Sequence, residues 1–328
     1  MININYQEIC QELLSQLPPK QREVIERRFG LKTGKRETLE AIGKSRGICR
    51  ERVRQIEKVS LAKMKKLVLQ NKEIFKAFAK QLKNDGGVKE ENAFLEELGG
   101  QNFKAHAYFL LTLSGEFIRA AESDDFYCLW AQNNESLENA KNFILQSIAK
   151  LESEKKLMAN RELANLAGLK KTIAESYLGI SKRIQKNKDG FYGLQEWPEV
   201  NPKGIKDKIY LLLKKSQKPL HFAEVAKRIE NSLVQTVHNE LIRDPRFVLI
   251  GRGIYALKEW GYVEGDVKDV ISNIFGNENR PLAKSEILEK VLKQRRIKEN
   301  TVLMNLSNKK YFSRDNEGKY SRINVQEA

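Results

Sequence analysis

The sequence predicts a mainly α-helical chain with small β-hairpins, built as an N-terminal helix-turn-helix followed by a tandem array of similar small domains. Apolar residues recur at helical spacing in the first 70 residues, and from about residue 88 a pattern of helices closed by a short hairpin returns about every 64 residues. The length of 328 residues exceeds one ordinary core. The composition, 41% hydrophobic with 7 prolines and 20 glycines, is that of a folded chain.

Membrane and secretory classes are disfavoured by the apolar pattern. The longest apolar candidate, Tyr108 to Leu113, is far shorter than the roughly 18 residues that a membrane span needs. The opening MININYQEIC has neither the basic segment nor the apolar core of a secretory signal. We therefore expect a cytoplasmic, nucleoid-associated protein with no membrane partner.

Catalytic and metal-binding patterns are also missing from the sequence. Catalytic carboxylate clusters, glycine-rich phosphate loops and CxxC pairs are not found. The cysteines and histidines stand apart from one another: Cys10, Cys49, Cys128, His106, His221 and His238. We expect no enzyme activity, no cofactor, no metal and no small-molecule substrate, and a DNA-modifying or restriction-associated role ranks last.

The net charge of +16 is distributed unevenly along the chain. Residues 1–83 carry +11, residues 84–135 carry −7 and residues 201–261 carry +6. A strongly basic segment favours a polyanionic partner, because it neutralises phosphates and releases their counterions. The acidic segment is expected to avoid DNA.

The first 70 residues contain the boundary signals of a helix-turn-helix. Leu17-Pro18-Pro19 predicts a helix start, and Gly30 predicts its left-handed end. Thr38 can cap a second helix, and the turn at Arg46-Gly47 precedes a third helix that begins near Cys49. In this plan the second helix of the pair enters the major groove of DNA.

The third helix has one apolar and one polar face. Its core face is predicted at Val53, Ile56, Ser60, Met64 and Leu67. The polar face presents side chains that can bond base edges, flanked by cations that suit phosphates. The base-reading candidates are Arg50, Glu51, Arg54 and Gln55, and the phosphate or flanking candidates are Thr38, Arg52, Lys58 and Lys63. A solvated face laced with Glu–Arg pairs is the alternative interpretation.

Three runs, LPPKQREVIERRFGL, TLEAIG and RERVRQIEKVSLAKM, closely resemble region 4 of the sigma-70 family of initiation factors. The resemblance implies that the module reads the minus-35 promoter element and docks on the flap of the RNA polymerase beta subunit. It places Arg50, Glu51, Arg54 and Gln55 at base-reading positions and Arg52 at a phosphate contact. The family usually has Thr where this chain has Cys49, which is a poor cap.

The resemblance covers about a sixth of the chain. Only sixteen residues precede Leu17, so we expect the chain to lack the sigma regions that grip core polymerase and melt the minus-10 element. A regulatory or accessory role is therefore expected, rather than that of a complete sigma factor.

The repeat is marked by tyrosines near the end of each unit. Tyr127, Tyr192, Tyr255 and Tyr320 are separated by 65, 63 and 65 residues. The third unit shows the plan most clearly: IKDKIYLLLKK, PLHFAEVAKRI and VQTVHNELIRD are three helices, and RFVLI and GIYAL flank a glycine turn that makes a hairpin, or wing. Three helices and a wing predict a winged helix-turn-helix.

Within this unit, KPLHFAEVAKRI and TVHNELIRDPRFVLIGRGIYALKEWGY resemble the HARE-HTH family, which includes the N-terminal domain of the RNA polymerase delta subunit. The predicted fold is thus mainly α with small β-wings: a sigma region 4-like helix-turn-helix followed by tandem winged-helix domains. The predicted domains are 1–83 (sigma region 4-like), 88–134 (acidic, degenerate winged helix), 136–200 (winged helix), 202–261 (HARE-HTH) and 262–328 (winged helix).

A second DNA surface is predicted on the array. Its candidates are Lys182, Arg183, Lys186, Lys188, Arg243, Arg246 and Arg252. The alternative is that these residues lie on basic faces that contact only solvent. Many winged helices serve as protein docking units, so the predicted fold alone does not decide between the two.

The leading functional hypothesis is a DNA-binding transcription protein that recognises promoter-like double-stranded DNA, with the array contacting DNA, RNA polymerase or both. The alternative is a delta-like accessory protein that binds RNA polymerase and touches DNA only secondarily. The acidic unit favours this alternative.

Overall fold

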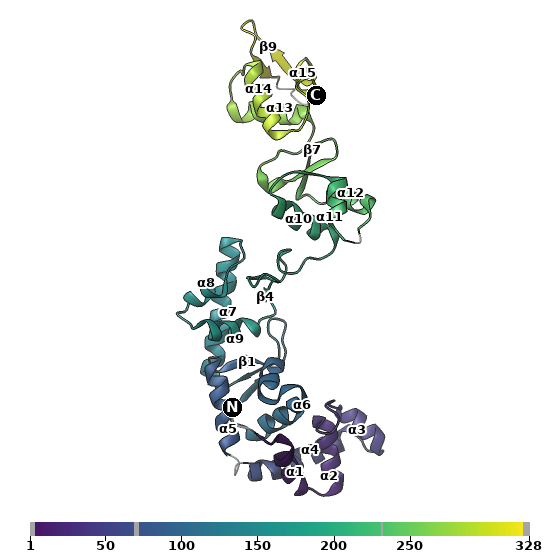
Figure 1. Ribbon diagram of the computed structural model, residues 1–328, viewed down its shortest axis with the longest axis vertical. Helices are drawn as coiled ribbons and strands as arrows, with labels where there is room; N and C mark the ends of the chain where they lie inside the picture. The colour runs from purple at the N-terminus through teal and green to yellow at the C-terminus, as the bar shows by residue number, and fades with distance from the viewer. Residues whose placement is uncertain (1–3, 69–71, 231, 324–328) are drawn as a thin grey trace. The chain divides into compact units, whose positions relative to one another are not determined.

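The computed structural model describes residues 4–68, 72–230 and 232–323 (Figure 1). The chain divides into two compact units, 1–200 and 201–328. The structure is mainly helical with small antiparallel sheets, as predicted. Within the described ranges, no helix has both the length and the apolar character to cross a bilayer.

The chain begins with four helices: α1 (Tyr6–Ser15), α2 (Pro19–Phe29), α3 (Leu39–Arg46) and α4 (Arg50–Val68). The predicted boundary signals are confirmed. Pro19 occupies the first turn of α2, and Gly30 ends that helix at φ 70°. The side chain of Thr38 caps α3 by accepting a hydrogen bond from the backbone N–H of Ala41 at 3.1 Å. Gly47, at φ 66°, makes the left-handed turn between α3 and α4.

The next segment, which ends in the acidic residues 84–135, adds a helix, a strand, a long helix and a hairpin. These elements are α5 (Lys72–Asn84), β1 (Val88–Glu90), α6 (Glu91–Ser114), β2 (Ile118–Ala120) and β3 (Leu129–Ala131). Gly100 takes a non-helical conformation inside α6, so α6 is two helices joined at a kink. The strands form one antiparallel sheet in the order β1-β3-β2.

The following segment repeats this order of elements. It contains α7 (Asn134–Glu154), α8 (Asn160–Asn165), α9 (Lys171–Gly179), β4 (Ile184–Lys186) and β5 (Tyr192–Leu194). A single bridge between Met158 and Tyr192 takes the place of the first strand. Its third helix, α9, ends at Gly179, and the residues that follow lead into β4.

The second compact unit contains two further copies of this order. The first has α10 (Ile205–Ser216), β6 (Leu220–His221), α11 (Phe222–Arg228), α12 (Val234–Arg243), β7 (Phe247–Gly251), β8 (Ile254–Leu257) and the 3₁₀ turn η1 (Lys258–Trp260). The second has α13 (Val267–Glu278), α14 (Lys284–Gln294), α15 (Glu299–Leu306), β9 (Phe312–Arg314) and β10 (Tyr320–Arg322), with a bridge from Leu282 to Tyr320.

We call these four segments the first to fourth repeats. In each, the residue before the N-cap of the second helix pairs with an aromatic residue of the hairpin: Leu220 with Tyr255, Met158 with Tyr192 and Leu282 with Tyr320. In the first repeat this pair is Lys89 with Trp130. The prediction that Tyr127 marks the first repeat is therefore wrong. Trp130 is 2% exposed and holds the core position, whereas Tyr127 is 37% exposed.

The N-terminal helices and the first repeat share one hydrophobic core. A continuous cluster of buried side chains runs from Tyr6 and Cys10 through Met64 and Phe78 to Trp130. The predicted boundary at residue 83 stays a prediction, but this core extends across it. A smaller cluster of Val24, Ile42 and Val53 holds α2, α3 and α4 together.

Candidate nucleic-acid interface

The α3–α4 pair is held at a fixed angle by close backbone packing. A Cβ atom on Gly43 would lie 2.7 Å from the carbonyl oxygen of Ile48, so glycine is required at that position. Arg27 donates to the carboxylate of Glu37 at 3.0 and 2.7 Å and to Ser45 Oγ at 2.8 Å. These bonds brace α2 against α3, and α4 therefore has a rigid support.

The predicted two-faced character of α4 is confirmed. Val53, Ser60 and Met64 are buried, while Ile56 and Leu67 are half-buried. On the opposite face lie exposed polar side chains, which include every base-reading candidate: Arg50, Glu51, Arg54 and Gln55. The structure therefore places the four candidates together, on a helix whose other face is anchored in the core.

Two pairs of side chains on this face are joined to each other, one by an ion pair and one by a hydrogen bond. Arg54 donates to the carboxylate of Glu51 through Nε at 2.8 Å and Nη2 at 2.6 Å. This interaction lowers the pKa of Glu51 and raises the pKa of Arg54. Arg52 Nη1 donates to the side-chain oxygen of Gln55 at 3.1 Å. The Glu–Arg pairing of the alternative interpretation thus exists, on the same side chains that suit base readout.

The flanking candidates occupy different environments. Arg52 and Lys58 are exposed on α4, and Lys58 makes no ion pair among the described residues. Lys63 donates from Nζ to the carbonyl oxygen of Gln16 at 2.6 Å, directly after the end of α1. Lys63 is therefore a brace between α4 and α1. Thr38 caps α3.

Cys49 is exposed immediately before α4. Its carbonyl oxygen accepts hydrogen bonds from the backbone N–H groups of Arg52 and Val53, at 3.0 and 3.3 Å. The residue thus stands at the capping position that the sequence indicated.

Residues 13–66 match the family "Sigma-70, region 4". This segment is a sigma-70 region 4 domain. It contains all of α2 and α3, the turn between α3 and α4, and residues 50–66 of α4. It therefore includes every base-reading candidate.

Several sigma factors are similar to the region 4 domain. The principal sigma factor HrdD of Streptomyces coelicolor is 43% identical over 56 residues, which are 17% of this chain and 17% of HrdD. RpoS of Coxiella burnetii is 41% identical over 66 residues, 20% of this chain and 19% of RpoS. SigA of Clostridium acetobutylicum is 43% identical over 54 residues, 16% of this chain and 14% of SigA. The chain therefore matches less than a fifth of the length of these relatives.

Outside the region 4 domain, the basic candidates of the second repeat are mostly paired with acids. Lys182 contacts Glu122 at 2.6 Å and donates to the carbonyl oxygen of Ser123 at 2.7 Å. Arg183 pairs with Glu152 at 3.3 Å, and Lys186 pairs with Glu175 at 2.8 Å. Lys188 is exposed in the β4–β5 turn and makes no ion pair among the described residues.

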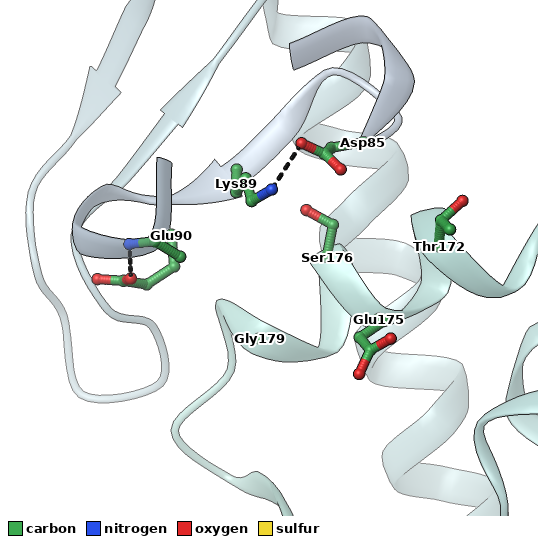
Figure 2. A pocket seen from close by; sticks show the side chains of 8 residues that line it. Asp85, Lys89, Glu90, Thr172, Glu175, Ser176 and Gly179 are labelled. Carbon is green, nitrogen blue, oxygen red and sulfur yellow. Dashed lines mark hydrogen bonds and ion pairs between the residues drawn. The ribbon is translucent and has the colours of Figure 1, made fainter. Parts of the chain in front are cut away.

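The third helix of the second repeat, α9, is docked on the first repeat. Ser176 Oγ donates to the carbonyl oxygen of Val88, and Tyr177 Oη donates to that of Gly86, both at 2.7 Å. Figure 2 shows the pocket that remains between α9 and β1, with Glu175 on the helix side and the Lys89–Asp85 pair on the other. Burial raises the pKa of Asp85. This face of α9 is acidic and partly covered, so it does not resemble the exposed polar face of α4.

In the third repeat, the candidates also divide into two groups. Arg243 and Arg252 are exposed and make no ion pair among the described residues. Arg246 is half-buried and bonds Asp207 at 2.9 Å and Asp244 at 2.6 Å. Its guanidinium also lies over the ring of Tyr210, at 5.1 Å from the centroid. Hydrogen bonds to Asp244 and Asp207 raise the pKa of Arg246. The bond to Asp207 connects the start of α10 to the start of β7.

Sequence reasoning missed two features of these surfaces. The acidic partner Asp207 lies 39 residues before Arg246, so the pairing left no local signal. Exposed apolar side chains at the third helices were also missed: Leu233, 75% exposed, at the N-cap of α12, Ile242, 63% exposed, on α12, and Met304, 75% exposed, on α15. Within the described residues, no group of three or more His, Cys, Asp or Glu side chains is placed to hold a metal ion.

Proposed function

We propose that this protein is a DNA-binding transcription protein that reads promoter-like DNA of the minus-35 type and acts in transcription initiation or its regulation. The exposed polar face of α4 within a sigma-70 region 4 domain carries the proposal. Arginine can bond guanine O6 and N7, glutamine can bond adenine N6 and N7, and glutamate can accept from cytosine N4. Arg50, Glu51, Arg54 and Gln55 supply these groups on one helical face.

The remaining groups position α4 rather than select a sequence. Arg52 and Lys58 flank the reading face and suit contacts to phosphates, which fix orientation but carry no sequence information. Lys63 acts through Gln16, by holding α1 against α4. The function proposed for the whole chain is thus DNA binding and not catalysis, and it implies a nucleoid-associated location in the cytoplasm.

We propose that the four repeats are winged helices in a tandem array and that the third is a HARE-HTH domain. The support is their common order: a helix, a first strand or bridge, two helices and a closing hairpin. We propose that the array contacts DNA, RNA polymerase or both. Because α9 is docked on the first repeat, the second repeat would reach DNA through its β4–β5 turn, which carries Lys188, and not through its third helix.

Selection of bound sequences from a random duplex pool tests the promoter-reading role. The full chain is used, because the core around Tyr6 and Trp130 extends beyond residue 83. We expect a short motif to be enriched at moderate salt, and the Arg54→Ala variant to lose preference at one base pair by about 1–3 kcal/mol. Failure to enrich any motif would contradict base readout by α4.

An RNA polymerase-binding accessory role is the second candidate function. Exposed apolar side chains on α12 and at its N-cap favour it, because exposed apolar groups suit a protein partner better than phosphate. These are Val234 and Ile242 on the helix and Leu233 at the N-cap. Capture of polymerase by the full chain from a nuclease-treated extract is expected in this case. Loss of capture after nuclease treatment would show that DNA had bridged the two.

A further inference from the structure

Three successive residues at the end of α14 bond the fourth repeat to residues 261–265, which connect it to the third repeat, and to β7 of the third repeat itself. Gln294 bonds the backbone of Gly261 and Val263 at 3.2 and 3.1 Å. The buried guanidinium of Arg295 donates to the carbonyl oxygens of Val263 and Gly265, both at 2.7 Å. The N–H of Arg296 donates to the carbonyl oxygen of Ile250 in β7 at 2.8 Å. The segment between α14 and α15 is therefore bonded to the edge of the preceding hairpin.

Close backbone packing strengthens this junction. A Cβ atom on Gly251 would lie 2.9 Å from the carbonyl oxygen of Arg296 and 3.3 Å from its Cβ atom. The β7–β8 turn thus lies directly against the α14–α15 segment. Arg252 follows Gly251 at the tip of that turn, and Lys298 follows Arg296 by two residues at the N-cap of α15, so this contact brings the backbone of the two cationic segments together although they are far apart in the sequence.

These three cations differ from their neighbours in having no acidic partner. Arg252, Arg296 and Lys298 are exposed and form no ion pair or side-chain hydrogen bond in the part of the chain that the structure describes. Nearby lysines are paired: Lys258 with Glu264 and Lys293 with Glu289, each at 2.7 Å. One carboxylate, Glu299, follows Lys298 in the first turn of α15. The local balance remains positive.

We propose that the β7–β8 turn of the third repeat and the α14–α15 segment of the fourth form one composite site for the phosphate backbone of duplex DNA. The inference rests on the proposed DNA-binding function. Unpaired arginine and lysine side chains are the usual sequence-independent contacts to phosphate. Here they stand on backbone that is already fixed by hydrogen bonds, so little ordering of the main chain opposes binding.

The salt dependence of DNA binding by the full chain tests the site. A duplex of random sequence is titrated between about 50 and 200 mM salt, because each phosphate contact contributes roughly 0.9 to the log–log slope. Combined replacement of Arg252, Arg296 and Lys298 by glutamine is expected to reduce the slope by about 2–3 and to weaken binding at low salt by about tenfold or more.

A charge-matched control removes three paired lysines from the same two repeats. Lys258, Lys293 and Lys319 are each bonded to a glutamate, and their replacement by glutamine is expected to change the slope by less than about 1. Equal slope changes in the two variants overturn the composite site, because they indicate net charge alone. Thermal unfolding of both variants should match that of the unmodified chain.

The outcomes separate this site from the proposed function. If the unmodified chain binds no duplex, both proposals fail. If it binds and selects a motif through Arg54 while the Arg252, Arg296 and Lys298 variant keeps the full slope, only the composite site fails. Loss of polymerase capture by that variant, with DNA binding unchanged, assigns the surface to a protein partner and overturns the phosphate site.

Discussion

Arg54 and Glu51 face each other one turn apart on α4 and are joined by two hydrogen bonds, at 2.8 and 2.6 Å. Both side chains are more than half exposed, so the pair itself adds little to folding stability. Its importance is that it occupies the guanidinium of Arg54 in the free protein. Binding to a base edge must therefore replace these bonds or use the two side chains as one preassembled unit.

The Glu51→Gln variant should separate these cases. Removing the carboxylate releases Arg54 and deletes a negative charge from the face that we propose to bind DNA. We expect the full chain to bind all duplexes about 3- to 10-fold more tightly while its preference among sequences falls. Fluorescence anisotropy with the selected motif and a scrambled duplex measures both effects.

Glu73→Gln is the matched control, because Glu73 forms an exposed pair with Lys76 at the same helical spacing. It removes an equal charge away from the reading face and should leave sequence preference intact. Unchanged preference in the Glu51→Gln variant would mean that the pair has no part in readout.

Replacement of Cys49 by threonine is expected to stabilise the fold. A threonine hydroxyl at this position can accept from a free N–H in the first turn of α4, which the thiol does poorly. Cys49→Thr is expected to raise the free energy of unfolding of residues 1–200 by about 1 kcal/mol and to tighten DNA binding. Cys49→Val, which has the same branched shape without the hydroxyl, serves as the control in urea titrations. Equal effects of the two variants would exclude capping as the cause.

A side chain at Gly43 in α3 is expected to destabilise the packing of α3 against the turn that leads into α4. In Gly43→Ala, the new methyl group would meet the carbonyl oxygen of Ile48 at 2.7 Å, so the backbone must shift. We expect a loss of about 1–3 kcal/mol and a weaker preference for the selected motif, because the angle of α4 changes.

Gly179→Ala in α9 provides the comparison, since no atom lies within 4 Å of the added group. That change should be neutral or stabilising by up to about 1 kcal/mol. Thermal unfolding of the full chain follows both variants. A neutral Gly43→Ala would show that the turn adjusts at little cost.

The sequence was sufficient to predict the region 4 domain because its signals are local. Pro19, Gly30, Thr38 and Gly47 lie at helix ends where backbone geometry limits the choice of residue. The apolar period of α4 likewise reports a single helix on a single core. Such patterns need no knowledge of distant contacts.

Long-range contacts account for what the sequence did not reveal. Tyr127 matched the tyrosine spacing, but pairing between β1 and β3 selects Trp130 for the core position. Arg246 has the sequence context of a surface cation, but it is paired with Asp207, which lies 39 residues earlier in α10. The docking of α9 on the first repeat depends on backbone carbonyls of Gly86 and Val88, which side-chain patterns do not encode.

Cys10 predicts how the stability of the N-terminal core depends on pH. Its thiol is buried beside Tyr6 in the core that extends to Trp130, and burial raises the pKa of Cys10 to about 12. In the unfolded chain the thiol ionises near its ordinary pKa of about 9. Between these values only the unfolded chain loses the proton, so stability is retained below pH 9 and falls as the pH rises toward 12.

The Cys10→Ala variant isolates this contribution. It should be less stable at pH 7, because a buried group is lost, but its stability should fall less steeply with pH. Between pH 7 and pH 10.5 the unmodified chain is expected to lose about 2 kcal/mol more of its free energy of unfolding than the variant loses. Burial, and secondarily the neighbouring Cys10 thiol, raise the pKa of Tyr6 to about 12. Tyr6 titrates in both proteins, and only the part of its shift that comes from Cys10 differs between them. Urea titrations of both chains in reducing buffer measure the difference, and parallel pH profiles would show that the thiol remains protonated in both states or ionises in both.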